Sequence, residues 1–327
     1  MSFHPLAFPL LRRLRAEEFT SGEELAKVFQ VSRATVSHAL FGIDGVMAVP
    51  GKGYALKHPL DWLDRQEVLA LMRGSLALDI FDAVDSTSLF ISRYLSQNSS
   101  FTENLPWPWA VAAEVQTAGK GRRGRTWHAP LGGSILFSLL WRFEAPMASL
   151  SGLSLAIGVA LVLALESLGA SGVFLKWPND LWGSKDGREG KLGGILVELF
   201  GEAMGPVWGV LGVGINCSLK EKDLSAISGA AFDLSSLGVS ACRASVLAAM
   251  LDALLLALPR FEKEGFSPFR GDWIKRHLWQ EKTVEVIESS GGSFFGVARG
   301  VDETGALLVI AQGKERRLST GEVSLRR

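Results

Sequence analysis

The stretch Gln116-Thr-Ala-Gly-Lys-Gly-Arg-Arg-Gly-Arg-Thr-Trp-His128 lies between two apolar runs and carries the strongest chemical signal in the chain. Its cations are Lys120, Arg122, Arg123 and Arg125, and three glycines are interleaved with them. Glycine lets the backbone wrap closely around a ligand, and lysine and arginine donate charge-assisted hydrogen bonds to phosphate oxygens. The stretch therefore predicts a site for a charged small molecule, with a solvated turn or a nucleic-acid patch as the alternatives.

The glycines of this stretch also spell the dinucleotide-binding pattern G-x-G-x-x-G. They are Gly119, Gly121 and Gly124. That fingerprint has to lie between a strand and a helix. Here Pro130 follows, and residues 134–143 are apolar, rich in aromatics and short, which favours a strand. With a strand also predicted at residues 109–115, the order is strand, basic loop, strand, and a dinucleotide fold is disfavoured.

The overall composition predicts an ordinary globular protein of two or three domains. The chain has 327 residues, 47% of them hydrophobic and 21% charged, and its net charge is zero. Proteins that coat nucleic acid are usually basic, so we expect any DNA contact to be confined to one module. Cys217 and Cys242 supply neither a metal cluster nor a disulfide framework, and the N-terminus has no signal-peptide pattern. We therefore expect a cytoplasmic protein.

The two longest apolar runs, residues 153–165 and 246–258, predict buried helices. Each is shorter than the about 20 residues that a membrane-spanning helix needs. We expect no membrane association.

Residues 1–60 predict a winged helix-turn-helix domain. A first helix is expected over residues 10–18, Ser21 and Glu24 form a capping box for a second helix, and Ser32 caps a third. That third helix is expected over residues 33–40, and a two-stranded wing formed by residues 46–49 and 51–56 completes the domain.

The third helix of this domain carries the candidate DNA contacts. They are Arg33, Thr35, Ser37 and His38. The domain has seven basic and five acidic residues, which predicts a modest nonspecific affinity for DNA. A small helical dimerisation or docking module is the alternative.

The rest of the chain predicts two more domains and an α+β protein of three domains in all. Residues 61–276 begin with a helix near 61–73 and continue with strands alternating with helices. Residues 277–327 form a small β-barrel domain, with short strands separated by glycines. These strands are expected at residues 283–287, 293–299, 306–310, 315–318 and 323–325.

Further motifs of the central domain could line a ligand site. Asp85-Ser86-Thr87-Ser88 follows the predicted strand 78–84 and could cap a helix or offer hydroxyl groups. Lys176-Trp177-Pro178-Asn179-Asp180 ends another strand, and its proline fixes a turn that presents a cation, an amide and an anion together. Glycines at 193, 194, 212 and 214, near Lys191 and Asn216, indicate that a ligand approaches the backbone closely. Each motif alone is also explained by capping, a common turn or strand packing.

Taken together, the order and content of these motifs closely resemble those of the biotin protein ligase family. The resemblance is to the bifunctional type, in which a biotin-[acetyl-CoA-carboxylase] ligase also serves as the repressor of the biotin operon. It spans nearly the whole chain, including Gly305-Ala-Leu-Leu308 and Gly321-Glu-Val-Ser-Leu325 near the C-terminus. It implies a class II synthetase-like α/β catalytic domain and an SH3-like C-terminal barrel.

The resemblance implies a reaction in two steps. The carboxylate of biotin attacks the α-phosphate of ATP to form biotinyl-5′-AMP and pyrophosphate. A lysine of the biotin carboxyl carrier protein domain of acetyl-CoA carboxylase then attacks the mixed anhydride. Mg²⁺ would shield the pyrophosphate, with Asp180 as a candidate ligand. Operator DNA, and a homodimer in the adenylate-bound state, are also implied.

Site residues follow from the matched positions. Lys191 and Arg122 are implied to be catalytic, because a phosphoryl transition state between two anions needs pre-positioned cations. The implied biotin site consists of Ser86, Thr87, Ser88, Gln116, Lys120, Arg122 and Lys191. The implied ATP and adenylate site consists of Arg122, Arg125, Trp127, Lys176, Asn179 and Asn216. Hydroxyl and amide groups are suited to hydrogen bonding with a buried ureido ring.

The chain departs from the family pattern at several positions. Lys120 replaces an arginine and lacks its planar fork, and Ser88 replaces a common asparagine. Residues 183–190 look longer than usual and predict a surface excursion. Residues 32–51 look several residues shorter than in the repressor type, which leaves open whether DNA contact is lost, altered or directed at a different operator.

Two other functions are compatible with parts of this pattern. A lipoate or octanoate ligase shares the broad fold and the adenylate chemistry. A metabolite-sensing transcription factor would bind its effector without turnover. The retained set of Lys191, Arg122, Asn179 and Asp180 favours an enzyme over a sensor.

Overall fold

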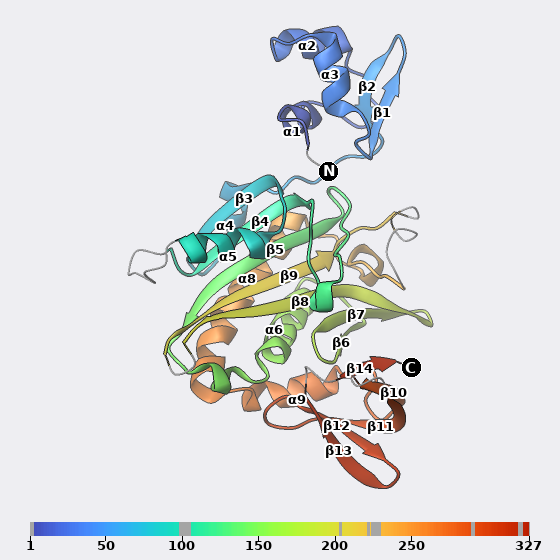
Figure 1. The fold of residues 1–327 in the computed structure, drawn as a ribbon. Coiled ribbons are helices and arrows are strands. Elements are labelled where there is room, and N and C mark those ends of the chain that lie inside the picture. Colours follow the sequence, from blue (N-terminus) through green and yellow to red (C-terminus); the bar gives the residue numbers. More distant parts are fainter. Residues whose placement is uncertain are drawn as a thin grey trace.

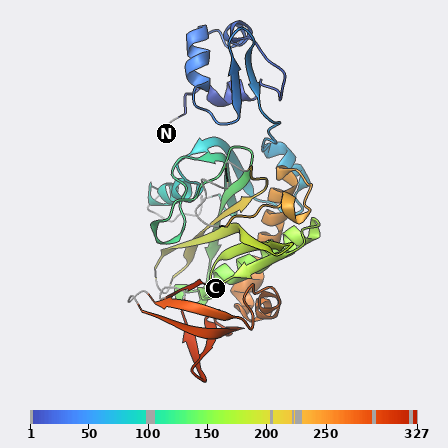
Figure 2. The same cartoon turned by 90° about the vertical axis from the view of Figure 1, so that its right-hand side faces the viewer.

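The structure is a computed structural model that describes residues 3–97, 106–202, 205–220, 223, 230–288, 292–319 and 323–326. Three parts follow one another along the chain and are stacked from top to bottom in Figure 1. A small N-terminal part lies at one end, a large sheet with its helices lies in the middle, and a small sheet lies at the other end. The view turned by 90° shows the same stacking (Figure 2).

The N-terminal part consists of three short helices and a β-hairpin. Its elements are α1 (Ala7–Leu11), α2 (Gly22–Val28), α3 (Arg33–Leu40), β1 (Val46–Val49) and β2 (Gly53–Leu56). Both predicted caps are confirmed. Ser21 Oγ accepts a hydrogen bond from Glu24 N at 3.1 Å, and Ser32 Oγ accepts one from Thr35 N at 3.0 Å.

The predicted helix over residues 10–18 is wrong, because α1 ends at Leu11. The chain then turns to pair with β2: Leu56 N donates to Arg15 O at 2.8 Å, and Glu17 N donates to Leu56 O at 3.1 Å. Glu17 has a φ of 63°, outside the right-handed helical region. Backbone pairing with the hairpin thus overrides the local helical preference.

The central part is built on a seven-stranded sheet in the order β3-β4-β5-β9-β8-β7-β6. Its strands are β3 (Ala77–Val84), β4 (Trp109–Gln116), β5 (Ser134–Phe143), β6 (Val173–Lys176), β7 (Asp180–Lys185), β8 (Arg188–Gly201) and β9 (Val207–Asn216). The pair β3 and β4 is parallel and the other pairs are antiparallel.

The two faces of this sheet are covered by different helices. The helices of the central part are α4 (Arg65–Leu71), α5 (Thr87–Gln97), α6 (Leu153–Ser167), α8 (Arg243–Glu264) and α9 (Ser267–Lys275). The single-turn 3-10 helices are η1 (Arg122–Gly124), η2 (Met147–Leu150) and η3 (Ser235–Leu237). Alternate residues of β4 separate the faces: Val111 packs in one cluster with Ile91 of α5, whereas Ala110 and Ala112 join the larger core around α6 and α8.

Helix α8 is longer than the apolar run that predicted it. With 22 residues it is long and apolar enough to cross a membrane by length and composition alone, so the prediction that this segment is too short was wrong. However, 56% of its apolar window is buried inside the protein, and the helix packs against α6 and β5. The predicted burial of both apolar runs is confirmed.

Two other predicted segments differ in the structure. The helix expected near residues 61–73 begins only after Asp64, whose Oδ1 accepts a hydrogen bond from Glu67 N at 2.9 Å. The expected surface excursion at residues 183–190 is part of the regular hairpin β7–β8. This hairpin turns at Asp186 and Gly187, which have φ values of 52° and 76°.

The C-terminal part is a five-stranded antiparallel sheet in the order β13-β12-β11-β10-β14. Its strands are β10 (Thr283–Glu288), β11 (Ser293–Val301), β12 (Leu307–Ala311), β13 (Lys314–Leu318) and β14 (Val323–Arg326). The five predicted strands are confirmed. Gly321 and Glu322 of the quoted C-terminal motif lie outside the described residues.

Candidate functional site

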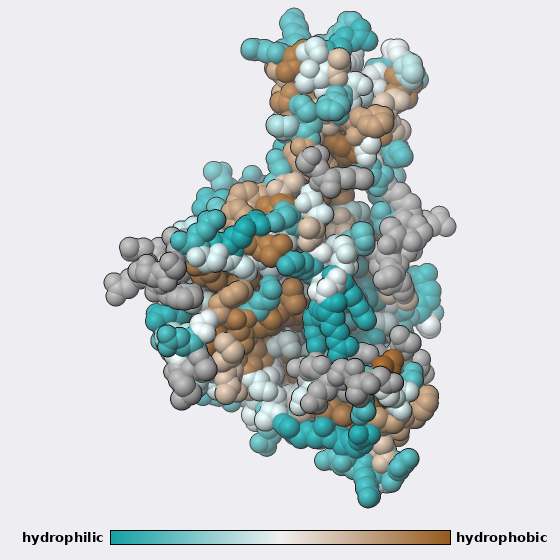
Figure 3. Space-filling model, viewed as in Figure 1, coloured by the Kyte–Doolittle hydropathy of each residue, from teal (hydrophilic) through white to brown (hydrophobic). Residues whose placement is uncertain are grey.

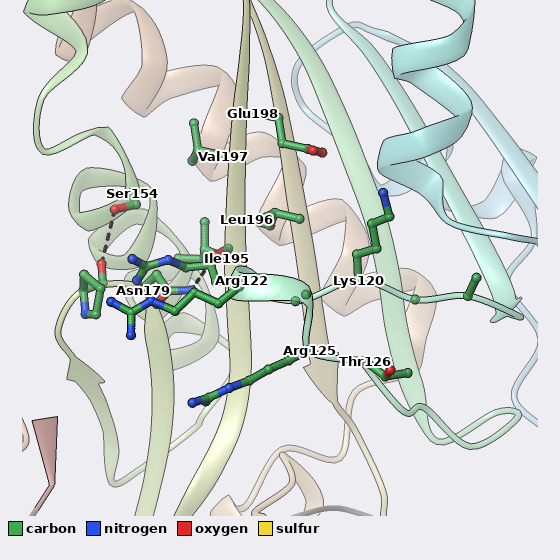
Figure 4. A pocket seen from close by; sticks show the side chains of 16 residues that line it. Lys120, Arg122, Arg125, Thr126, Ser154, Asn179, Ile195, Leu196, Val197 and Glu198 are labelled. Carbon is green, nitrogen blue, oxygen red and sulfur yellow. Dashed lines mark hydrogen bonds between the residues drawn. The ribbon is translucent and has the colours of Figure 1, made fainter. Parts of the chain in front are cut away.

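A cavity of about 640 Å³ opens between the basic loop and the sheet. Residues 118–126 line one side, and residues 195–198 of β8 form the floor. Ser154, Pro178 and Asn179 line the end nearest β7 (Figure 4). On the molecular surface, the hydrophilic region at η1 borders a hydrophobic stretch over the sheet (Figure 3). The cavity therefore combines a polar rim with a floor that is apolar apart from Glu198, and ligand sites commonly combine apolar surface with a few polar groups.

The basic loop connects β4 to β5, as the sequence predicts, and not to an α-helix. It closes on itself, because Gly121 N donates to Arg125 O at 2.7 Å and Trp127 N donates to Gly119 O at 2.9 Å. Arg123 has a φ of 57° in the single turn η1. The strand, loop, strand order is confirmed, and the fingerprint for a dinucleotide is not in its required setting.

Arg122 reaches from the loop to the turn before β7. Its Nη1 donates to Asn179 Oδ1 at 2.9 Å, and Asn179 Nδ2 donates to Ile195 O at 2.7 Å (Figure 4). Burial lowers the pKa of Arg122 from its ordinary value. Lys120 and Arg125 are exposed and extend from the same loop in other directions. Arg122 is thus held in place by the turn before β7.

Lys191 lies in β8 at the same end of the sheet. Its Nζ is 2.7 Å from Asp180 Oδ1 and 5.5 Å from the centroid of the Trp127 ring. Gly194 lies beside both groups, because a Cβ there would be in ordinary van der Waals contact, 3.4 Å from Lys191 Nζ and 3.5 Å from Asp180 Oδ1. The structure brings the predicted catalytic lysine, the predicted metal ligand and the predicted adenylate tryptophan together.

Trp127 lies directly on the backbone of β9. A Cβ on Gly214 would be 2.7 Å from Trp127 Cε2, so only glycine leaves room for the indole at this distance. Among the described residues, Trp127 Nε1 is buried without a hydrogen-bond partner. A buried donor in this position could serve a polar ligand group.

A cluster of buried hydroxyl groups lies at the start of α5. Thr87 N and Thr87 Oγ1 donate to Gln116 Oε1 at 2.7 and 3.1 Å, and Ser138 Oγ lies 2.7 Å from Thr87 Oγ1 and 2.9 Å from Ser88 Oγ. Ser86 is also buried, and its Oγ accepts a 3.4 Å hydrogen bond from Leu89 N. The structure therefore joins all four predicted side chains in one region.

Ser138 of β5 was missed at the sequence level. It is fully buried in the middle of that cluster. The available signal was a hydroxyl residue inside the apolar run 134–143, because a buried polar group needs partners.

Lys176 ends β6 and lies between two indole rings. Its Nζ is 4.3 Å from the ring centroid of Trp182 and 4.4 Å from that of Trp279. Burial is the largest cause that lowers the pKa of Lys176 to about 8, while the Asp180 carboxylate acts in the opposite direction. No aromatic partner of this lysine was predicted from the sequence.

Asn216 ends β9 and forms hydrogen bonds with the backbone at and near Lys191. It is 3% exposed, and its Nδ2 donates to Phe232 O at 3.1 Å and to Lys191 O at 3.4 Å. Its contact with a ligand stays a prediction, and its observed contacts give it a role in holding β8.

The residues present suit a magnesium ion that arrives with nucleotide phosphates. Within the described ranges, no group of three or more histidine, cysteine, aspartate or glutamate side chains could hold a metal ion. Asp180 offers one carboxylate at the Lys191 end of the cavity. One or two carboxylates together with substrate phosphates are the usual environment of Mg²⁺ in nucleotide enzymes.

The predicted DNA contacts on α3 are not equally available. Arg33, Ser37 and His38 are exposed, and Arg33 pairs with Glu23 at 3.0 Å. Thr35 is half-buried and its Oγ1 lies 2.9 Å from Ser32 Oγ within the helix cap. The outer surface of α3 is therefore formed by three of the four predicted residues.

Family models match the central and the C-terminal parts of the chain. Residues 82–216 match the Biotin/lipoate A/B protein ligase family, and residues 281–326 match the Biotin protein ligase C terminal domain. The bifunctional ligase/repressor BirA of Escherichia coli K12 is 34% identical over 331 residues, covering 100% of this chain and 99% of the relative. The chain belongs to the biotin protein ligase family.

Relatives without the repressor designation match less of the chain. The biotin–[acetyl-CoA-carboxylase] ligase of Mycobacterium tuberculosis is 33% identical and covers 82% of this chain and 96% of the relative. The biotin protein ligase of Aquifex aeolicus, solved with biotin and ATP, is 28% identical with a TM-score of 0.62. That match covers 77% of this chain and 99% of the solved chain. These matches place the mixed α/β catalytic fold and the antiparallel C-terminal sheet in the family.

Proposed function

We propose that this protein is a bifunctional biotin protein ligase and repressor. It forms biotinyl-5′-AMP from biotin and ATP, and it transfers the biotinyl group to a lysine of the biotin carboxyl carrier protein domain of acetyl-CoA carboxylase. The observation that carries this proposal is the meeting of Lys191, Asp180 and Trp127 beside the fixed Arg122 guanidinium. The full-length match to a relative named as a bifunctional ligase/repressor supports it.

The protein has three domains with different roles. Residues 1–60 are a winged helix-turn-helix domain, residues 61–276 are the class II synthetase-like catalytic domain, and residues 277–327 are an SH3-like domain. The order α2, α3, β1, β2 supports the first assignment, and the five-stranded antiparallel sheet supports the last. The protein works in the cytoplasm, together with its carrier protein.

The first step joins two anions, so it depends on cations. An oxygen of the biotin carboxylate attacks the α-phosphorus, and the bond from that phosphorus to the bridging oxygen of pyrophosphate breaks. Lys191 leaves its pair with Asp180 to contact the carboxylate and the α-phosphate, and Arg122 holds the phosphate from the loop side. Arg125, Lys176 and Asn179 bind the ATP phosphates, and Asn216 holds the backbone of Lys191.

A magnesium ion that arrives with ATP would be held by Asp180 and the phosphates, and its charge would stabilise departing pyrophosphate. The carboxylate then has two functions. Before substrate binds, it pairs with the Lys191 ammonium and keeps it oriented. When that ammonium turns to the substrates, the carboxylate becomes available to hold the magnesium ion.

Biotin is held at its two ends. The buried hydroxyl and amide groups of Ser86, Thr87, Ser88 and Gln116 bind the ureido ring, because a buried polar ring needs hydrogen-bond partners. Lys120 covers the ring from the loop. Trp127 supports the adenylate, and its unpartnered Nε1 is available to it.

In the second step, the amine of the carrier lysine attacks the carbonyl carbon of the anhydride. The new amide bond forms as the bond to the AMP oxygen breaks, and AMP leaves with the electron pair. Residues 118–126, which line one side of the cavity, shield the anhydride from water on that side until the carrier docks.

One assay tests the enzyme class. The full chain is incubated with ATP, Mg²⁺, a carrier domain and either biotin or lipoate, and the mass of the carrier is measured. We expect modification with biotin alone. Modification with lipoate would instead establish a lipoate ligase, and no modification with either would favour a metabolite-sensing transcription factor.

A lysine variant tests the site. Lys191→Ala should abolish formation of biotinyl-AMP while leaving the far-UV circular dichroism unchanged. Lys185→Ala is the matched control, because Lys185 lies in the same hairpin and its Nζ donates to Ser236 O at 2.8 Å. Adenylate formed by Lys191→Ala at the wild-type rate would remove the proposed role.

The repressor activity has its own test. Arg33, Ser37 and His38 are exposed on α3, the helix that would enter the major groove of an operator. A gel shift with DNA from upstream of biotin-synthesis genes should appear when biotin and ATP are added, together with a homodimer in sedimentation velocity. No adenylate-dependent shift at micromolar protein would contradict operator binding.

A further inference from the structure

The C-terminal part is joined to the catalytic sheet beside Lys176. Strand β6 is the edge of the seven-stranded sheet, and residues 276–278 pair with it. Leu175 N donates to Arg276 O at 2.8 Å, and Leu278 N donates to Leu175 O at 2.9 Å. Because two backbone hydrogen bonds fix this junction, the next residue, Trp279, is brought against the end of β6.

Trp279 and Trp182 flank the ammonium group of Lys176 on two adjacent sides. The nitrogen is 4.4 and 4.3 Å from the two ring centroids, and the rings are 6.2 Å apart with an interplanar angle of 57°. Trp182 belongs to β7, whereas Trp279 comes from the start of the C-terminal part. Both indole Nε1 atoms are buried without hydrogen-bond partners among the described residues, so the rings contribute their faces here. We call these three residues the lysine clamp.

An aromatic environment leaves a lysine available to an anion. Cation–π attraction replaces part of the hydration that a buried ammonium loses, and it supplies no counter-charge. The charged groups facing Lys176 are Asp180, Lys191 and Arg125. Since the Asp180 carboxylate is 2.7 Å from Lys191, the charge of Lys176 is best neutralised by an incoming phosphate.

A second contact with the C-terminal part fixes the turn that follows Lys176. Trp177 Nε1 donates to Gly305 O at 3.1 Å, and Ser151 Oγ donates to Thr304 O at 2.8 Å. The turn that carries Asn179 and Asp180 therefore rests on the loop between β11 and β12. The position of the clamp is held at two separate places.

We propose that Trp279 and Trp182 are positioning residues that aim Lys176 at the ATP phosphates, so that the C-terminal part contributes to ATP binding. This inference rests on the proposed function, because it takes Lys176 as a phosphate-binding residue. It assigns the two tryptophans no contact with biotin. Loss of one ring should therefore affect ATP and leave biotin binding unchanged.

The test compares Trp279→Leu with Trp279→Phe in the full chain. We expect Trp279→Leu to raise the KM for ATP about tenfold, which corresponds to about 1.4 kcal/mol, and to leave the KM for biotin unchanged. Trp279→Phe keeps an aromatic face and should return the KM for ATP to within about twofold of wild type. Trp182→Leu should act in the same direction as Trp279→Leu.

Phe295→Leu is the matched control. Phe295 is an aromatic residue of the same C-terminal sheet, but it is 67% exposed. This variant should keep both KM values. Thermal unfolding of every variant separates a local effect from loss of the fold.

Equal increases in the KM for ATP and for biotin, or no rescue by phenylalanine, would overturn the clamp. Adenylate formation by the wild-type protein tests the proposed function separately. If it forms no adenylate, equilibrium titration with MgATP alone still compares wild type with Trp279→Leu and Trp279→Phe. Equal affinity in that titration would also overturn the clamp.

Discussion

Glu114 and Arg243 form a buried ion pair that joins the inter-domain linker to the central sheet. Their side chains are 0% and 3% exposed, and Arg243 Nη1 lies 2.7 Å from Glu114 Oε2. Glu114 Oε1 accepts a hydrogen bond from Leu63 N at 2.7 Å, in the linker before α4. We expect Glu114→Ala to destabilise the central part strongly, because it leaves both partners buried without their acceptor.

The expected magnitude follows from what each partner loses. Breaking a buried pair at one end typically costs about 3–5 kcal/mol, and the Leu63 N–H loses its acceptor as part of that cost. Arg243 keeps hydrogen bonds to Ser134 O and Asp61 O, at 2.7 and 2.6 Å. These remaining contacts place the expected loss in the free energy of unfolding near the lower limit, about 3 kcal/mol.

Urea unfolding followed by circular dichroism measures this loss. Glu23→Ala is the control, because its pair with Arg33 is 71–75% exposed and should contribute less than about 1 kcal/mol. The conservative variant Glu114→Gln keeps an acceptor oxygen for the Leu63 N–H and should therefore lose less stability than Glu114→Ala. A loss below about 1 kcal/mol for Glu114→Ala would refute the reasoning.

Two further predictions concern the junction and the adenylate site. Burial lowers the pKa of His277, at the junction with the C-terminal part, to about 4 from 6.5. The contribution of the neutral imidazole to stability is therefore present above pH 6.5 and is lost as the pH falls toward 4, and the free energy of unfolding should fall by about 3 kcal/mol over this range. His277→Asn should reduce the dependence of the free energy of unfolding on pH. An equal dependence in the two proteins would contradict this. Gly214→Ala places a methyl group 2.7 Å from Trp127 Cε2, so biotinyl-AMP should bind at least about tenfold more weakly by calorimetry. Gly271→Ala, where a Cβ meets nothing within 4 Å, is its control, and equal affinities of these two variants would disprove the steric argument.

The sequence was most informative where local chemistry decides the structure. Ser21 and Ser32 marked two helix starts correctly, because a cap is made within three residues. Proline and glycine after the basic loop marked the return to a strand. Family resemblance joined the separate motifs, and the structure brings Lys191, Asp180 and Trp127 within reach of one another.

Features that depend on distant partners could not be predicted. The helix expected over residues 10–18 ends early, because Arg15 and Glu17 pair with Leu56 of the hairpin. Lys176 was recognised as a cation of a turn, but its aromatic environment needs Trp279, about a hundred residues later in the chain. Ser138 looked like part of an apolar strand until α5 placed Thr87 and Ser88 against it. In each case the deciding contact joins separate elements.

One end of the central sheet holds both the proposed ligase site and the anchor of the N-terminal domain. Ser134 accepts hydrogen bonds from Arg243 and lies opposite Asn216 in the β5–β9 pair. The Asn216 amide in turn holds the backbone carbonyl of Lys191. The linker, through Asp61 and the Glu114–Arg243 pair, is therefore fixed to the same row of polar groups that supports the lysine. Because residues from neighbouring strands meet at this end, an adenylate bound at the proposed site would lie close to the attachment of the N-terminal part.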